Sequence, residues 1–398
     1  MRVLHLTTEF PPSIWGGLGT AVGGLAIASA RAGMTVGVGL ITGWNSGSYG
    51  ALPAIARKAG HRTRDRASAN LTVFGLPGRN LADAAITLGR AWRPDVIHLH
   101  SFWLWDAAKA VRESIRAPLV YTVHSLDRAE YDLGQGPAEC LSQWNTQRDV
   151  IERADRVVAL TRDEQDLIVG YCPRAQSRVR IVGNGIADRP AARRAVRKQR
   201  GGPPVVLFTG RFVHRKGIGD LIAAIPQVLD AAPSTRFVLA GGHRGCTGAD
   251  MARCWLPAAD HHLYRNHVEF TGWLGIADMA EWYQRSDILV VPSWYEPFGM
   301  VVLEGMLYGL AVAAADVGGP KEMLEHGRTG ILFPPKAPEA LAGALLQIIL
   351  KPSLSRELAR SAASEVRRKW LWSQVVRKMR AVYDDALDHR LPCHAFGA

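Results

Sequence analysis

The sequence predicts an α/β protein built from two doubly wound parallel sheets. Short apolar segments alternate with Ala-rich helical segments, which is typical of a parallel sheet covered by helices on both faces. The alternation begins again after a basic stretch near the middle of the chain. The chain has 398 residues, which is too long for one ordinary core. We therefore expect two domains with a cleft between them.

Each half contains six short apolar segments that predict strands. In the first half these are residues 3–7, 35–41, 96–99, 119–123, 156–160 and 179–182. In the second half they are residues 205–209, 237–240, 268–270, 288–291, 310–314 and 331–333. Residues 19–32, 81–91, 301–310 and 373–388 predict helices. The last of these helices carries apolar residues at helical spacing, which indicates a packing surface.

A basic stretch separates the two halves. Its basic residues are Arg189, Arg193, Arg194, Arg197, Lys198 and Arg200. The neighbouring Pro and Gly residues indicate a solvated linker, and a lipid surface or an acidic acceptor are the alternative roles for its charge. The predicted organisation is a first domain at 1–185, a basic linker at 186–203, a second domain at 204–370 and a C-terminal helix at 371–398.

The net charge of +12 and the pI near 9.8 point to an acidic partner. Nucleic acid, a nucleoside-diphosphate sugar and an anionic membrane all fit this charge. No aromatic residue interleaves the basic residues of the linker, which argues against nucleic acid. Peripheral contact with an anionic membrane stays open.

Other sequence features narrow the class of protein. No run of 18 apolar residues occurs, and the start predicts a strand rather than a signal peptide. The five cysteines form no Cys-x-x-Cys pair, so we expect reduced thiols and neither a zinc site nor a disulfide framework. The expected location is the cytoplasm.

The segment from Glu296 to Glu304 carries the most information about function. It places two carboxylates eight positions apart, and a Pro-Phe-Gly turn follows Glu296 directly. The backbone amides of Phe298, Gly299 and Met300 would lie at the start of the helix, where phosphate or sugar oxygens bind well. Two carboxylates facing one cavity suit a ligand rich in hydroxyl groups. The alternative is a capped helix with two solvated acids.

Arg211 and Lys216 lie between a strand end and the next helix start. Such a pair can hold a diphosphate, because Arg offers two parallel donors and Lys a point charge. The sequence contains no Asp-x-Asp pair to hold Mg²⁺, so we expect no metal cofactor. The two cations would then stabilise the leaving diphosphate. The alternative is ordinary solvated charge.

Gly16 and Gly17 stand before the predicted helix 19–32. Paired glycines at a helix start let the backbone approach a phosphate closely. A dinucleotide-binding fingerprint is the competing interpretation. It fits poorly, because about eight residues separate the glycines from the strand and the third glycine is replaced by Val22.

Three histidines follow two predicted strands. His124 ends one strand and could hydrogen-bond a sugar hydroxyl. His98 and His100 end another strand and share a sheet face, so at least one is expected to be structural. Their spacing could serve a metal, but the sequence suggests no third ligand.

Two further turns are candidates for ligand contacts. The segment from Gly318 to Glu322 follows a strand and would form a turn facing phosphate or sugar. Trp273 follows the strand 268–270 and could meet a nucleotide base, although a single Trp is equally well explained by packing.

Together these motifs resemble those of the retaining glycosyltransferases of family 4 (glycosyl transferases group 1), which have the GT-B fold of two Rossmann-like domains. The matching pieces are Gly16-Gly17, His124, residues 152–158, Asn184-Gly185-Ile186, Gly210-Arg211, Lys216-Gly217, residues 296–304 and 318–322. They span nearly the whole chain in the expected order.

The resemblance implies a role for each domain and for several residues. The acceptor would bind the first domain, with loops such as 44–49 and 126–144 setting its identity, and the last helix would return to that domain. On the second domain, Glu304 would bind the ribose and Glu296 the donor sugar, whereas Phe298, Gly299 and Met300 would contact the sugar or phosphate. Arg211 and Lys216 would bind the diphosphate, His124 the donor sugar, and Gly17 the diphosphate from the first domain.

The segment from Glu9 to Gly19 also resembles the start of bacterial glycogen synthases. Those enzymes have a lysine just before the glycine pair, whereas this chain has Ile14 and Trp15 there. This departure argues against an ADP-glucose donor and a glucan acceptor.

We therefore predict a metal-independent hexosyltransferase that acts with retention. Its donor would be a UDP-, GDP- or ADP-sugar, and its acceptor a hydroxyl group of a sugar, glycolipid or small molecule. The alternatives are a nucleotide-sugar epimerase of the same fold, a glucan-elongating enzyme, and a binding subunit without turnover.

Overall fold

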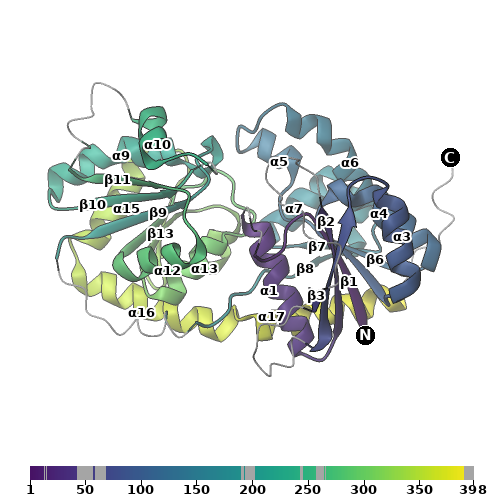
Figure 1. The fold of residues 1–398 in the computed structure, drawn as a ribbon. Coiled ribbons are helices and arrows are strands. Elements are labelled where there is room, and N and C mark those ends of the chain that lie inside the picture. The colour runs from purple at the N-terminus through teal and green to yellow at the C-terminus, as the bar shows by residue number, and fades with distance from the viewer. Residues whose placement is uncertain are drawn as a thin grey trace. The chain divides into compact units, whose positions relative to one another are not determined.

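The computed structural model consists of two units (Figure 1). It describes residues 1–12, 14, 16–42, 57–58, 69–189, 192, 202–242, 245–256, 264 and 266–389. Unit 1 comprises Met1–Arg128, Glu139–Gly185 and Trp372–Ala398, and unit 2 comprises Ala129–Ala138 and Ile186–Leu371. The loop 44–49 and the linker residues 193–200 lie outside the described residues.

Unit 1 contains a sheet with the strand order β3-β4-β2-β1-β5-β6-β7-β8. Its strands are β1 (Arg2–Thr7), β2 (Thr35–Thr42), β3 (Arg57–Lys58), β4 (Leu71–Pro77), β5 (Val96–Leu99), β6 (Leu119–Thr122), β7 (Arg156–Ala159) and β8 (Val179–Ile181). Neighbouring strands are parallel, except that β3 is antiparallel to β4. Every residue of β5, β6 and β7 is buried, as expected for a sheet covered on both faces.

The helices of unit 1 follow its strands. They are α1 (Gly17–Arg31), α3 (Leu81–Trp92), η1 (Phe102–Leu104), α4 (Trp105–Ile115), α6 (Glu139–Arg153), α7 (Arg162–Tyr171), η2 (Pro173–Arg178) and α17 (Trp372–Asp388). The short helix α5 (Asp127–Asp132) begins in unit 1 and ends in unit 2.

Unit 2 contains a second parallel sheet, with the order β11-β10-β9-β12-β13-β14. Its strands are β9 (Val205–Gly210), β10 (Arg236–Gly241), β11 (Val268–Gly272), β12 (Ile288–Val291), β13 (Ala311–Ala315) and β14 (Ile331–Phe333). The helices are η3 (His214–Lys216), α9 (Ile218–Ala231), α10 (Gly248–Trp255), α12 (Ile276–Arg285), α13 (Met300–Tyr308), α14 (Gly318–Met323), α15 (Pro338–Ile349) and α16 (Pro352–Lys369). The chain order reverses between β9 and β12, and ligands bind beyond the carboxyl ends of strands at such a point.

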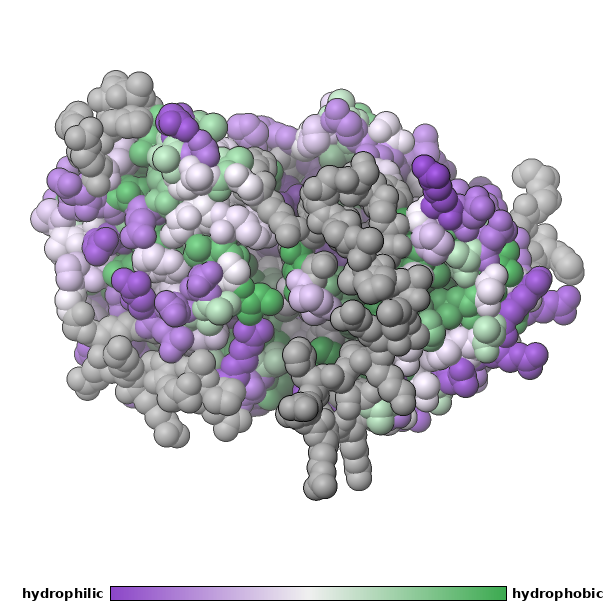
Figure 2. Space-filling view, in the orientation of Figure 1, coloured by the Kyte–Doolittle hydropathy of each residue, from purple (hydrophilic) through white to green (hydrophobic). Residues whose placement is uncertain are grey.

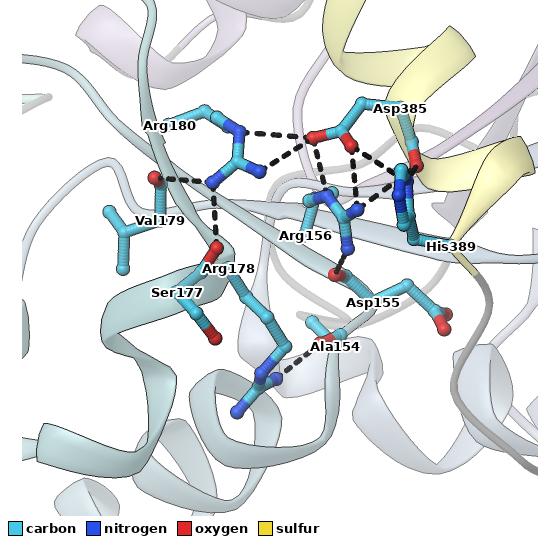
Figure 3. A network of polar contacts seen from close by, with 9 residues as sticks. All are labelled: Ala154, Asp155, Arg156, Ser177, Arg178, Val179, Arg180, Asp385 and His389. Carbon is cyan, nitrogen blue, oxygen red and sulfur yellow. Dashed lines mark hydrogen bonds and ion pairs between the residues drawn. The ribbon is translucent and has the colours of Figure 1, made fainter.

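Helix α17 belongs to unit 1 although it ends the described chain. It packs beside α1 (Figure 1). Its apolar residues, including Met379 and Tyr383, belong to a hydrophobic core that also contains residues of α1 and the first sheet. An ion-pair network adds to this packing. Asp385 of α17 accepts hydrogen bonds from Arg156 of β7 at 2.6 and 2.7 Å and from Arg180 of β8 at 3.0 Å (Figure 3).

The predicted elements and the structure agree closely. The strands 96–99, 288–291 and 331–333 have the predicted bounds, and the other predicted strands shift by one or two residues. The sequence analysis missed β3 and β4. Residues 129–138 group with unit 2, where Glu130 forms an ion pair with Arg215.

The surface mixes hydrophilic side chains with smaller hydrophobic areas on the face that Figure 2 shows. The large exposed hydrophobic residues among those described are Trp103, Tyr131, Leu133, Ile276 and Leu350. In the described part of the chain, no helix is both long and apolar enough to cross a membrane.

Candidate active site

The candidate site of unit 2 lies in the loops that follow β9 and β12. These two strands are neighbours at the centre of the sheet, so their loops leave the same edge side by side. The loop after β9 carries Arg211 and Lys216, and the loop after β12 carries Glu296. The strand order therefore brings together residues that are far apart in the sequence.

Lys216 and Glu296 form a direct contact. The Lys216 ammonium donates a hydrogen bond to Oε2 of Glu296, and the Ser293 hydroxyl donates to the same oxygen at 3.2 Å. Gly217 allows the two loops to approach each other closely, because it has φ +67° and an added Cβ would lie 1.9 Å from the Pro292 carbonyl oxygen. Only glycine permits this backbone and this approach.

The charges around this pair act on both partners. Burial raises the pKa of Glu296, but the charges of Lys216 and Arg215 outweigh it and leave the pKa below its ordinary value. The carboxylate is therefore ionised at neutral pH. Burial lowers the pKa of Lys216, whereas Glu296 raises it and the nearby Arg211 lowers it. Lys216 and Arg215 thus both act on one buried carboxylate, and Arg211 acts on Lys216.

Helix α13 begins directly after the Glu296 loop. Its first residue is Met300, and Gly299 precedes it with φ +87°. The side chain of Phe298 is buried and packs edge-on against Trp370, with ring centroids 5.7 Å apart. Phe298 and Gly299 can therefore meet a ligand only through the backbone.

Glu304 lies in the second turn of α13. Its Oε2 accepts a hydrogen bond of 2.6 Å from the hydroxyl of Tyr283 in α12. Burial raises the pKa of Glu304, and the Tyr283 hydrogen bond and the Arg189 charge oppose that rise. Tyr283 thus fixes the direction of the carboxylate, and the sequence analysis missed it because Tyr283 carries no motif.

The turn at Gly318 has a packing role. An added Cβ at Gly318 would lie 2.1 Å from the Glu296 carbonyl oxygen, and one at Gly319 would lie 1.6 Å from that of Phe298. The amide of Gly319 donates to the Glu296 carbonyl at 3.0 Å. The two glycines thus let the start of α14 pack directly against the backbone of the Glu296 loop.

The other predicted residues of unit 2 lie at the same edge of the sheet. Arg211 is exposed directly after β9. Trp273 is half-buried after β11, the edge strand, two strands away from β9. Arg215 is a candidate site residue that the sequence analysis missed. It forms an ion pair with Glu130, and its charge lowers the pKa of Glu296.

The predicted residues of unit 1 lie at the ends of its strands. Gly16 precedes α1 in an extended conformation, and an added Cβ there would meet no atom within 4 Å. Gly17 begins α1 and is exposed. His124 follows β6, and its Nε2 lies 3.1 Å from Nδ1 of His100. His100 and His124 line a small cavity together with residues of α1 and α17.

One group of described residues could hold a metal ion. It comprises His5, His98 and His100, whose ligand atoms lie within 4.8 Å of one another. The sequence analysis found no third partner for His98 and His100; the structure supplies His5, which pairs with His98 in the β1–β5 register. Both ring nitrogens of His98 are already bonded at 2.7 Å, to Tyr383 and Thr122, so hydrogen bonds satisfy this residue.

Models of two protein families match the chain. The model described as "Glycosyltransferase Family 4" matches residues 15–189, and the one described as "Glycosyl transferases group 1" matches residues 191–365.

Curated relatives match most of the chain at modest identity. The chain is 30% identical to the D-inositol 3-phosphate glycosyltransferase of Acidothermus cellulolyticus, over 74% of this chain and 68% of the relative. It is 26% identical to a glycogen synthase of Mycobacterium tuberculosis, over 96% and 94% of the two chains.

Solved structures show the same fold. Sucrose-phosphate synthase from Thermosynechococcus elongatus has a TM-score of 0.75 and 23% identity, covering 97% of this chain and 99% of that one. Anabaena HepE in complex with UDP-glucose has a TM-score of 0.72 and 20% identity, covering 96% and 99%. The matched families, the relatives and the two-domain GT-B architecture lead to one conclusion: the chain belongs to the family 4 glycosyltransferases (glycosyl transferases group 1).

Proposed function

We propose that this glycosyltransferase moves a hexosyl unit from a nucleoside-diphosphate sugar to an acceptor hydroxyl, with retention of configuration and without a metal ion. The contact between Lys216 and Glu296 carries the proposal. It joins a cation suited to a diphosphate with a carboxylate suited to sugar hydroxyls.

The neighbouring groups extend this arrangement. Arg211 adds a second cation at the end of β9, and the start of α13 adds backbone donors. These groups would stabilise the negative charge that develops on the leaving diphosphate. Glu304, held by Tyr283, would accept hydrogen bonds from the ribose hydroxyls.

Retention needs no separate protein base in this scheme. The leaving phosphate oxygen would take the acceptor proton on the same face of the sugar. A nucleotide-sugar donor is also supported by two structural neighbours, since Anabaena HepE is solved with UDP-glucose and starch synthase IV of Arabidopsis thaliana with ADP and acarbose.

A donor screen tests the proposal. The matching donor among UDP-, GDP- and ADP-sugars should raise the melting temperature by mass action. Adding the right acceptor should then release the nucleoside diphosphate, and NMR of the product should show the donor's anomeric configuration. An inverted product would refute retention, and loss of activity with chelator would refute metal independence.

Glucan elongation is the second candidate, because the match to the glycogen synthase spans 96% of this chain. The acceptors tested should therefore include a glucan. They should also include a sugar phosphate and D-inositol 3-phosphate, because relatives are named alpha-maltose-1-phosphate synthase and D-inositol 3-phosphate glycosyltransferase. An epimerase would instead convert the donor to a new isomer when no acceptor is present.

A further inference from the structure

His5, His100 and His124 form a hydrogen-bonded chain across three neighbouring strands of unit 1. Nδ1 of His5 lies 2.9 Å from Nε2 of His100, and Nδ1 of His100 lies 3.1 Å from Nε2 of His124. His5 is in β1, His100 follows β5, and His124 follows β6, with β5 between the other two strands. The chain of rings therefore leads from inside the sheet to its carboxyl edge.

The three imidazoles are neutral at ordinary pH. Burial lowers the pKa of His5 to about 3 and that of His124 to about 4. Burial also lowers the pKa of His100 well below its usual value, and the neighbouring histidines add to the effect. A neutral imidazole has one N–H donor and one bare nitrogen that accepts. The protons can therefore be ordered along the chain in only two ways.

The two orders differ at both ends of the chain. In the first order, His5 donates to His100 and His100 donates to His124, so His124 carries its own proton on Nδ1. In the second order, His124 donates from Nε2 to His100 and His100 donates to His5. His5 then carries its proton on Nε2.

The buried end of the chain favours the first order. His5 is fully buried, and within the described part of the chain its Nε2 has no hydrogen-bond partner. In the second order this nitrogen would be a buried N–H without an acceptor, which is unfavourable. In the first order it is a bare nitrogen, and among buried backbone groups acceptors without a partner are less rare than donors.

We propose that the buried chain from His5 through His100 holds His124 as the tautomer with its proton on Nδ1. His124 then offers an N–H donor to a sugar hydroxyl or ring oxygen and has no free lone pair with which to act as a base. His5 and His100 are positioning residues in this scheme. The contact with sugar rests on the proposed function, whereas the tautomer does not.

Nitrogen NMR of histidine-labelled protein tests the tautomer in the free state. The His124 signals are assigned by their loss in His124→Asn. Long-range proton–nitrogen correlations should show a protonated Nδ1 and a bare Nε2 for His124. The opposite pattern would overturn the proposal whatever the enzyme's substrate. So would a spectrum that changes when chelator removes a metal from His5, His98 and His100.

Two variants of nearly equal shape at His100 test the consequence for turnover. In His100→Asn the side-chain amide can still donate to Nε2 of His124. The His124 tautomer should therefore be unchanged, and kcat should stay within about threefold of the wild-type value. In His100→Asp the carboxylate accepts a hydrogen bond from His124. The proton should move to Nε2 of His124, and kcat should fall about tenfold or more.

A matched control separates this effect from damage to the core. The ring of His98 lies tilted against that of His100, with ring centroids 4.0 Å apart, but His98 hydrogen-bonds Thr122 and Tyr383, which are outside the chain of the three histidines. His98→Asn should lower the melting temperature and leave the His124 tautomer unchanged. If His100→Asp does not fold, the wild-type spectrum and His100→Asn decide. Full turnover with a reversed tautomer would remove the N–H donor from the reaction.

Discussion

The ammonium of Lys216 donates a hydrogen bond to the carboxylate of Glu296, although the two residues stand 80 positions apart in the sequence. The contact exists because β9 and β12 are adjacent and because Gly217 lies against the Pro292 carbonyl. The cation proposed to bind phosphate and the acid proposed to bind hydroxyl groups are therefore held as one unit.

Replacing Lys216 with alanine should lower kcat by roughly a hundredfold or more. The change removes one of the charges proposed to stabilise the leaving diphosphate. It also leaves the buried Glu296 without its nearest cation, so the pKa of Glu296 should rise. Steady-state kinetics with the matching donor measure the effect.

Lys351→Ala is the control for that experiment, since Lys351 is exposed in the turn before α16. It should leave kcat unchanged. Equal activity of Lys216→Ala and Lys351→Ala would remove Lys216 from the mechanism. Restoration of Lys216→Ala by added divalent metal would instead show that a metal can take over its role.

Replacing Glu304 with glutamine should weaken binding of the free nucleotide by about tenfold. The amide oxygen can still accept the Tyr283 hydrogen bond, so the fold should persist. The hydrogen bonds to ribose would lose their charged acceptor. Calorimetry measures the affinity, with Glu339→Gln at the start of α15 as control. An unchanged affinity would remove Glu304 from the ribose site.

The sequence was sufficient to predict the two sheets and the placement of the candidate residues of unit 2 directly after its strands. Strands buried on both faces appear as short apolar runs, and the motif residues lie directly after them. Strand β4 was missed because its burial is mixed and its centre is only partly buried. Its sequence therefore lacks a continuous apolar run that would distinguish it from a loop.

Partners that come from other elements could not be predicted. Tyr283, Arg215 and His5 carry no motif, and each becomes part of a site only through strand order or helix packing. His5 is the one for which a signal existed, because parallel pairing of β1 with β5 places it opposite His98. The turn at Gly318 and Gly319 is the opposite case, because the sequence motif was visible but was interpreted as facing a ligand. In the structure, close packing against the Glu296 loop explains why both residues are glycines.

Replacing Asp385 with asparagine should destabilise unit 1 near neutral pH. The hydrogen bonds from Arg156, together with the Arg156 and Arg180 charges, lower the pKa of Asp385 to about 2 against opposing burial. A depression of this size corresponds to about 2 kcal/mol. Since the pKa is lowered in the folded state, this stability is present above about pH 4 and is lost as the pH falls towards 2.

Urea unfolding at several pH values measures this effect. The stability gap between the wild type and Asp385→Asn should be largest near neutral pH and shrink below pH 4. Asp384→Asn is the control, because Asp384 is exposed and lies 4.0 Å from Arg380. A gap that does not depend on pH would show that the carboxylate charge contributes little to the attachment of α17.

Replacing Gly319 with alanine should disturb the candidate active site by displacing the Glu296 loop. The new Cβ would lie 1.6 Å from the Phe298 carbonyl oxygen, so the Glu296 loop or α14 must move. Both the melting temperature and kcat should fall. Gly343→Ala is the matched control, since Gly343 lies inside α15 with no atom within 4 Å of an added Cβ. It should raise stability by roughly 0.5–1 kcal/mol and leave kcat unchanged. If Gly319→Ala kept full turnover, the support that α14 gives to the Glu296 loop would be irrelevant to catalysis.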